Sequence, residues 1–173
     1  MLKCFYPDIY MRSTYEIDFQ AYYDAGYRGI IFDIDNTLTT HGDPADARCV
    51  ELAEKLRNMG FSMMLLSNNK EPRVKMFHDA VGIPYIFKAG KPGKAGYQKA
   101  MERMGTVREN TLFVGDQLFT DVWGAKRCGI FSVLVQPIDK KEEIQIILKR
   151  YLEKIVLASY KRACKKEGKV FLQ

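Results

Sequence analysis

Short apolar runs alternate with longer amphipathic segments along most of this chain. The apolar runs lie at residues 29–35, 62–67, 85–87, 111–116 and 131–136, and each has the length of one buried strand. Helical patterns lie between them, at 45–59, 71–81, 93–104 and 118–128. Apolar strands that alternate with helices are typical of a parallel sheet with helices on both faces. We therefore predict an α/β fold whose parallel sheet has about five strands.

A glycine follows each predicted helix. These glycines are Gly60, Gly82, Gly105 and Gly129. The residue after a helix commonly adopts a left-handed conformation, which glycine tolerates best. The pattern therefore predicts where the four helices end.

Polar side chains stand where four of the predicted strands end, or just beyond. In chain order they are Asp33, Asp35, Ser67, Asn68, Lys91, Asp116 and Asp121. The carboxyl ends of parallel strands meet at one edge of a sheet, and ligands bind there. We therefore expect these side chains to converge on one site.

Asp33 and Asp35 give that site two carboxylates on a strand that turns into a loop. Burying two like charges is costly unless a cation or phosphate chemistry uses them. The first carboxylate can attack phosphorus, and the second can protonate the leaving oxygen and later activate water. Asp116 adds an anionic ligand of the kind that Mg²⁺ prefers. Ser67 can donate a hydrogen bond to phosphate, and Lys91 can supply positive charge. The pattern indicates a magnesium-dependent phosphatase.

In order and spacing, four segments resemble the four motifs of the haloacid dehalogenase superfamily. They read FDIDNTL at 32–38, LSNN at 66–69, KP at 91–92 and GDQLFTD at 115–121. Their details are similar to subfamily IIIA, and within it to the YqeG-type phosphatases. The resemblance spans about residues 5–137 and implies a Rossmann-like fold.

The resemblance also implies a role for each motif residue. Asp33 would be the nucleophile and Asp35 the acid and base, with Mg²⁺ held by Asp33, the Asp35 carbonyl and Asp116. Ser67 and Lys91 would bind phosphate.

Asp121, Asn68 and Thr37 have two interpretations each. Asp121 would assist the metal or Lys91, or it would be a helix N-terminal carboxylate. Asn68 and Thr37 would bind phosphate, or they would only hydrogen-bond the loop backbone.

The spacing of the motifs leaves no room for a cap domain. Each of the intervals from Asp33 to Ser67 and from Ser67 to Lys91 accommodates one helix. We expect an open site, which admits bulky substrates. The YqeG-type resemblance implies phosphatidylglycerophosphate, a lipid phosphate, as substrate. A soluble sugar phosphate or nucleotide is the alternative. A nucleic-acid-binding module that uses the basic tail is a third hypothesis, although no known binding motif supports it and we expect no specific nucleic acid.

The C-terminal segment holds the net charge. Residues 149–173 contain eight basic and two acidic side chains, so their charge equals the +6 of the whole chain. We predict a core at 1–137 and an amphipathic basic helix at 138–173, packed on the core or extending from it. Its apolar stripe has helical spacing, and we expect the stripe to dock on the body; it comprises Ile144, Ile147, Leu148, Tyr151, Ile155 and Ala158. Removing residues 159–173 should therefore spare the fold.

The two ends also suggest a location. The basic tail would contact an anionic membrane or be a solvated helix end. Eight aromatic residues in 1–28 would lie in a membrane interface or pack over the sheet edge. The dispersed cysteines fit a reducing compartment, and we see no secretory signal or transmembrane run. We expect a cytoplasmic protein, peripheral at the inner face of the membrane if the tail binds lipid. The isolated His41 and His78 are interpreted as surface or loop residues.

Overall fold

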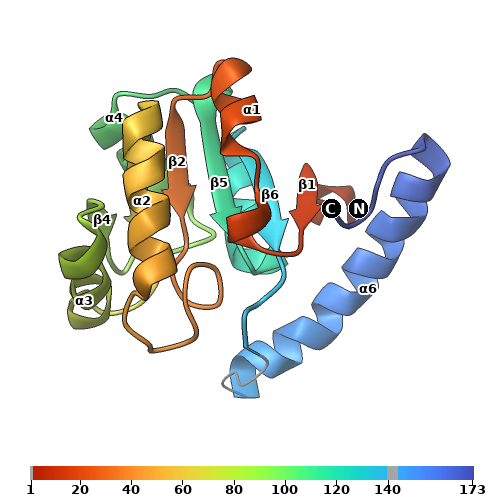
Figure 1. The fold of residues 1–173 in the computed structure, drawn as a ribbon. Helices are drawn as coiled ribbons and strands as arrows, with labels where there is room; N and C mark the ends of the chain where they lie inside the picture. The colour runs from red at the N-terminus through yellow and green to blue at the C-terminus, as the bar shows by residue number, and fades with distance from the viewer. Residues whose placement is uncertain (1, 140–143) are drawn as a thin grey trace.

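The structure is a computed structural model that describes residues 2–139 and 144–173, without the side chains of 144–148. Within these residues, six parallel strands form one sheet in the order β1-β6-β5-β2-β3-β4 (Figure 1). The strands are β1 (Ile9–Met11), β2 (Gly29–Phe32), β3 (Ser62–Leu66), β4 (Tyr85–Ile86), β5 (Thr111–Gly115) and β6 (Phe131–Val135). The five predicted strands and the parallel sheet are confirmed. Strand β1 was missed because only three residues pair at the sheet edge, which is too short for a periodic signal.

Helices cover both faces of the sheet. The helices are α1 (Phe19–Asp24), α2 (Ala47–Met59), α3 (Glu71–Val81), α4 (Lys94–Met104), α5 (Trp123–Arg127) and α6 (Ile144–Glu167). Short turns add η1 (Leu2–Phe5), η2 (Thr14–Glu16), η3 (Arg108–Asn110) and the π-helical η4 (Leu118–Val122). Side chains of β2 alternate between two cores: Ile30 and Phe32 pack with α1, α2 and α3, whereas Ile31 packs with α4 and α5. This alternation explains why the strand is apolar throughout.

The predicted helix ends are confirmed. Gly60, Gly82 and Gly105 follow α2, α3 and α4 with φ of 96°, 68° and 66°. Gly129 follows α5 with φ of 72°. Each glycine lets the chain leave its helix and enter the next strand without the steric cost of a Cβ atom.

The connections after β2 and β3 are short. One helix, α2, separates β2 from β3, and α3 with β4 leads on to the loop of Lys91. No cap domain lies in either interval, both of which the structure describes completely. The carboxyl ends of the strands, at the lower edge in Figure 1, are therefore open.

The N-terminal aromatic residues pack against the body. Phe19 contacts Phe32, with ring centroids 6.2 Å apart, and Tyr22 contacts Phe131 at 5.9 Å. All eight aromatic side chains of residues 1–28 are buried or half-buried. The interpretation that they pack on the body is confirmed, and their placement in a membrane interface stays a prediction.

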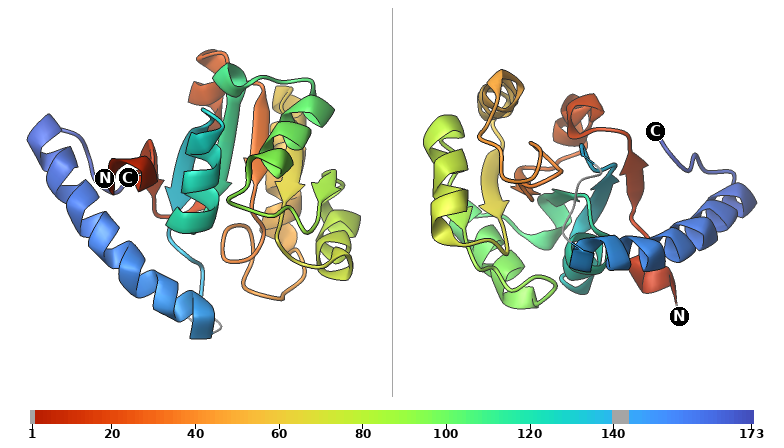
Figure 2. Two further views of the ribbon diagram at one scale, coloured as in Figure 1. Left: turned by 180° about the vertical axis from the view of Figure 1, so that it is seen from behind. Right: turned by 90° about the horizontal axis from the view of Figure 1, so that it is seen from below.

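Helix α6 leans against the β1 edge of the sheet (Figures 1 and 2). Its buried side chains are Glu153, Val156, Tyr160 and Cys164, which pack over η1, η4 and β1. The expected docking stripe was wrong, because Tyr151 and Ile155 are 61% and 62% exposed and Ala158 is exposed as well. The side chains of Ile144, Ile147 and Leu148 lie outside the described residues.

The end of the chain returns to strand β1. The Gln173 amide donates to the Tyr10 carbonyl at 2.9 Å, and the Arg12 amide donates to the Gln173 carbonyl at 2.9 Å. The Phe171 ring packs on Tyr10 and Tyr160. These contacts argue against the expectation that residues 159–173 are dispensable for the fold, which stays a prediction. Among the described helices, none has the length and apolar character needed to span a membrane.

Candidate active site

Asp33 lies at the carboxyl edge of the sheet, one residue beyond β2. Its amide still donates to the Val114 carbonyl of β5 at 2.9 Å, so the backbone there is fixed. The side chain is buried, and one carboxylate oxygen accepts a hydrogen bond from Lys91 Nζ at 2.6 Å. A buried carboxylate at this position is costly, and the ammonium group beside it offsets part of that cost.

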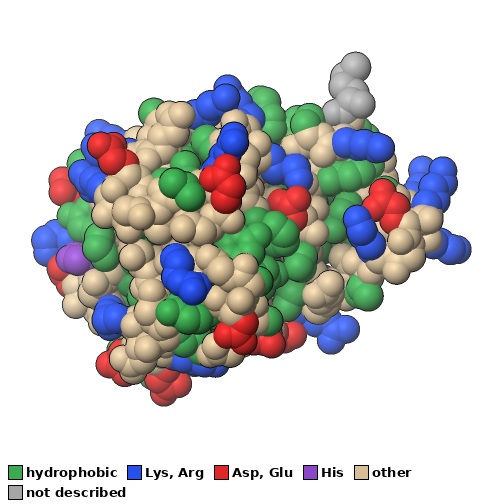
Figure 3. All heavy atoms as spheres, turned by 90° about the horizontal axis from the view of Figure 1, so that it is seen from above, with side chains coloured by type: hydrophobic (Ala, Val, Ile, Leu, Met, Phe, Trp, Pro, Cys, Tyr) green, Lys and Arg blue, Asp and Glu red, His purple; other side chains and the backbone are tan. Residues whose placement is uncertain are grey.

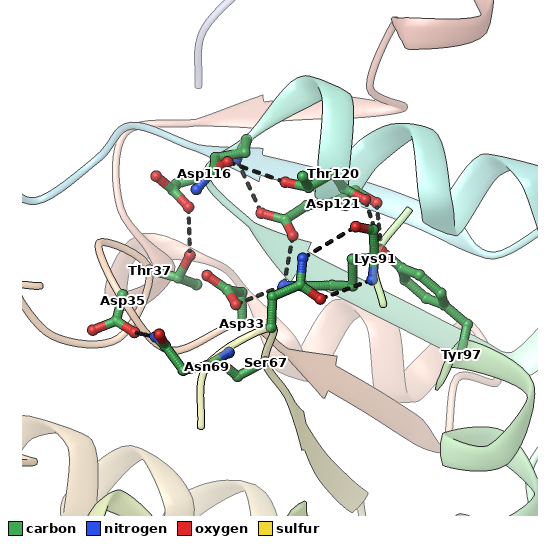
Figure 4. Close-up of polar contacts among 12 residues, drawn as sticks. Asp33, Asp35, Thr37, Ser67, Asn69, Lys91, Tyr97, Asp116, Thr120 and Asp121 are labelled. Atoms are coloured by element: carbon green, nitrogen blue, oxygen red, sulfur yellow. Dashed lines mark hydrogen bonds and ion pairs between the residues drawn. The ribbon is translucent and has the colours of Figure 1, made fainter. Parts of the chain in front are cut away.

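Lys91 joins Asp33 to Asp121 (Figure 4). Its ammonium group lies 2.7 Å from an Asp121 carboxylate oxygen, and both side chains are buried. Burial opposes the charged form of Lys91, but the carboxylates of Asp121 and Asp33 outweigh it and raise the lysine pKa. Lys91 is therefore a fixed positive charge in the site.

Tyr97 and Gly115 shape the turn after β5, the first through hydrogen bonds and the second by leaving space. The Tyr97 hydroxyl donates to the carbonyls of Thr120 and Asp121, at 2.9 and 3.2 Å. At Gly115, a Cβ atom would lie 2.6 Å from an Asp121 carboxylate oxygen, which is closer than real contacts allow. The glycine before Asp116 therefore has a structural reason: it leaves the space that the Asp121 carboxylate fills.

Asp33, Asp116 and Asp121 form a buried acidic cluster. One oxygen from each lies within 4.8 Å of the others. Burial raises the pKa of Asp33 to about 7, against an opposing effect of Lys91, and burial likewise raises the pKa of Asp116. Three carboxylates that are costly to ionise together fit a hard divalent cation, which binds oxygen ligands. The role of the Asp35 carbonyl as a ligand of that cation stays a prediction.

Asp35 points away from this cluster, toward the loop that follows β3 (Figure 4). Its carboxylate accepts hydrogen bonds from Arg73 at 2.9 Å, Asn69 at 2.6 Å and the Gly42 amide at 2.9 Å. A ring nitrogen of His41, a loop residue, lies 3.8 Å away. Arg73 was missed, since a basic residue in the first turns of α3 cannot be distinguished from a surface charge by sequence.

The remaining predicted residues have differing surroundings. Ser67 is buried, and its hydroxyl accepts a hydrogen bond from the Asn69 amide at 3.1 Å. Asn68 holds the Lys91 backbone through two hydrogen bonds, at 2.8 Å to its amide and 3.1 Å to its carbonyl. The Thr37 hydroxyl faces Asp116 at 3.4 Å. The Asn68 contacts favour its loop-stabilising interpretation, whereas the Thr37 hydroxyl contacts a carboxylate and not the loop backbone. The phosphate contacts of both residues stay predictions.

Helix α6 adds two residues that sequence reasoning missed. Arg150 donates to the Asp116 carbonyl at 2.7 Å and also forms an ion pair with the Asp116 carboxylate. Glu153 binds Arg150 at 2.9 Å and accepts a hydrogen bond from the Leu118 amide at 2.7 Å. The pair has the i,i+3 spacing of an ordinary surface ion pair. Only the packing of α6 brings it to the sheet edge.

Several of the predicted site residues line a cleft of about 210 Å³. Its lining includes Asp33, Asp35, Ser67, Asn68 and Lys91. Lys149 of α6 and His41 also line it. The cleft thus joins a buried carboxylate, hydrogen-bond donors and positive charge, which together can bind and attack a phosphate group.

Known proteins resemble this chain in sequence and in fold. A family model described as haloacid dehalogenase-like hydrolase matches residues 43–129. The chain is 35% identical to "Probable phosphatase YqeG" of Bacillus subtilis, over 94% of this chain and 95% of that protein. It is 24% identical to phosphatidylglycerophosphate phosphatase 1, chloroplastic/mitochondrial, of Arabidopsis thaliana, over 92% of this chain but 48% of that protein.

A solved structure shares the fold. The cobalt-bound deoxy-D-mannose-octulosonate 8-phosphate phosphatase of Haemophilus influenzae superposes with a TM-score of 0.52 at 17% identity. The match covers 63% of this chain and 68% of that one. At this identity the likeness extends to the fold, which is the Rossmann-like arrangement expected from the motifs.

Proposed function

The chain belongs to the haloacid dehalogenase-like hydrolases, and we propose on this premise that it is a magnesium-dependent phosphomonoester hydrolase whose nucleophile is Asp33. One observation supports this most strongly. Asp33 is a buried carboxylate that lines the cleft, contacts Lys91 and belongs to the acidic cluster. Burying a carboxylate costs free energy, and a role in binding or catalysis is a common reason for a fold to keep one.

In the proposed first step, an Asp33 oxygen attacks phosphorus and the bond from phosphorus to the leaving oxygen breaks. Lys91 and Ser67 stabilise the charge on the phosphoryl oxygens. Asp35 gives its proton to the leaving oxygen. In the second step Asp35 takes a proton from water, the water oxygen bonds to phosphorus, and the Asp33 carboxylate is released.

The acidic cluster would hold the cation. Asp33 and Asp116 are the proposed ligands with the Asp35 carbonyl, and Asp121 lies close enough to join them or to serve through Lys91. When bound, Mg²⁺ would neutralise the repulsion between the Asp33 carboxylate and an anionic phosphate. The Arg73 and Asn69 contacts would hold the Asp35 carboxylate at the cleft between the two steps, when it has given up its proton.

We further propose phosphatidylglycerophosphate as the substrate. The name of the plant relative supports this choice, and so does the absence of a cap between the motifs. An open cleft can receive the headgroup of a lipid that remains in a membrane. A soluble sugar phosphate or nucleotide is the competing substrate class.

Phosphate release tests the proposal. Detergent-dispersed phosphatidylglycerophosphate and a panel of soluble phosphomonoesters are compared with and without Mg²⁺. We expect release that needs Mg²⁺, with the lipid hydrolysed most efficiently. Full activity in excess chelator would contradict the metal role of the acidic cluster. A sugar phosphate or nucleotide as the best substrate would reject the lipid assignment and leave the phosphatase chemistry intact.

A further inference from the structure

The surface of α6 that faces away from the body divides into two parts. Toward the start of the helix it is mostly apolar, and the exposed residues there are Tyr151, Leu152, Ile155 and Ala158, with Lys154 beside the Tyr151 ring. Farther along it is basic, with exposed Lys161, Arg162, Lys165 and Lys166. We call these nine residues the outer face. In Figure 3, Lys and Arg side chains gather at the right-hand end of the molecule, over the end of α6.

The orientation of this face is fixed by contacts on the opposite side of the helix. Val156, Tyr160 and Cys164 are buried in the core beside Tyr10. Glu153 is buried on the Leu118 amide. Turning α6 to bury Tyr151, Ile155 and Ala158 would break these contacts and the ion pair of Arg150 with Asp116, so these three side chains stay exposed.

The outer face begins at the mouth of the candidate active site. Lys149 lines the cleft, and Tyr151 and Leu152 follow within one helical turn. From Lys149 the helix runs on for about 27 Å, since 18 residues at about 1.5 Å each lead from Lys149 to Glu167. Whatever covers the apolar part therefore lies beside the substrate entrance.

The charge on the face identifies the class of partner. The acidic residues of the described part of α6 are Glu153, which is buried, and Glu167, which pairs with Lys169. The outer face therefore presents positive charge, and the exposed carboxylate of the described helix, Glu167, lies at its far end. Apolar and aromatic residues beside Lys and Arg are the composition that binds an anionic membrane interface.

We propose that the outer face of α6 docks this enzyme on an anionic lipid bilayer. Tyr151, Leu152 and Ile155 enter the interface, and the basic part lies over the headgroups. The cleft, which Lys149 lines near the start of α6, then lies close to the membrane surface, where the lipid phosphate is. This inference depends on the lipid substrate proposed above, and it adds the exposed apolar residues of α6 to the basic tail that the sequence suggested as a membrane contact.

Vesicle flotation tests the docking surface. Wild type is mixed with vesicles of phosphatidylglycerol and phosphatidylcholine, or of phosphatidylcholine alone. We expect binding to the anionic vesicles only, with about tenfold weaker binding for Leu152→Ser/Ile155→Ser. The matched control is Val107→Ser, which removes an exposed apolar side chain elsewhere and should bind as wild type does. Wild type that ignores anionic vesicles, or a double variant that binds them equally well, would overturn the proposal.

Two further measurements separate the possible failures. Turnover of a soluble phosphomonoester should be equal in wild type and in the double variant. If wild type itself shows no turnover, the proposed function is refuted rather than the docking surface. Size-exclusion chromatography reports on a second copy of the chain: dissociation of a dimer by Leu152→Ser/Ile155→Ser would overturn the membrane assignment. If that variant does not fold, Lys161→Gln/Lys165→Gln replaces it, and binding equal to wild type would again refute the proposal.

Discussion

Buried charge defines the site at the scale of single residues. Lys91 contacts Asp33 and Asp121, and Arg150 contacts Asp116, so every carboxylate of the acidic cluster has a cationic partner. Both partners come from segments distant in sequence. The sequence predicted Lys91 because it follows a strand end, whereas Arg150 belongs to a helix whose position depends on tertiary packing alone.

The raised pKa of Asp33 predicts how Mg²⁺ and pH act together. The folded pKa is about 7, against 3.8 for a free carboxyl, so the folded protein binds this proton more tightly. Without metal, the stabilising effect of the proton is lost as pH rises from about 4 to about 7. Mg²⁺ needs the ionised carboxylate, so its binding competes with the proton. We expect the rise in melting temperature on adding Mg²⁺ to be larger at about pH 8 than at about pH 5. An equal rise at both values would contradict this assignment.

Gly115→Ala tests the space beside Asp121. The new Cβ atom would meet the Asp121 carboxylate at 2.6 Å and the Phe113 ring at 2.7 Å. We expect a loss of about 1–3 kcal/mol in the free energy of unfolding and at least tenfold lower phosphate release, because Asp121 and Lys91 must move. Chemical denaturation and a phosphate assay measure both. Gly26→Ala is the control, since it has open space around it and should cost about 1–3 kcal/mol of backbone strain without loss of turnover. Normal turnover in Gly115→Ala would refute the steric argument.

At the scale of elements, apolar periodicity predicted most of the fold. Five strands and the helices α2, α3 and α4 appear close to their expected bounds, because each buries side chains in the pattern that its sequence displays. Helix α6 did not follow this rule. The described part of its apolar stripe, from Tyr151 to Ala158, faces outward, since Arg150, Glu153 and the packing of Tyr160 determine the rotation of the helix. A single sequence cannot show which of two faces finds partners on the body.

Deleting residues 159–173 measures how strongly α6 and the chain end support the body. The deletion removes Tyr160, Cys164 and Phe171 from the core beside β1, and it removes the hydrogen bonds of Gln173. We expect a loss on the order of 3 kcal/mol or more in the free energy of unfolding. Urea denaturation provides the measurement, with Lys161→Gln/Lys165→Gln as the control that changes charge but keeps the packing. A truncated protein as stable as wild type would show that the segment is dispensable.

At the scale of the whole molecule, the charge and the chemistry occupy adjoining regions. The net charge of the chain equals that of residues 149–173, so the body is neutral and the basic region is α6 with the chain end. Arg150 links this region to Asp116 at the sheet edge. A shift of α6, such as one caused by binding to a charged surface, would therefore alter the contact of Arg150 with Asp116.

The central claim is that Asp33 forms a covalent bond to phosphorus. Mass spectrometry of rapidly quenched enzyme, mixed with substrate and Mg²⁺, tests it directly. We predict that the peptide containing Asp33 gains the mass of one phosphoryl group during turnover, and that Asp33→Asn shows neither this adduct nor phosphate release. Phosphate release by Asp33→Asn within about tenfold of wild type would contradict the account, because an amide cannot replace the attacking carboxylate.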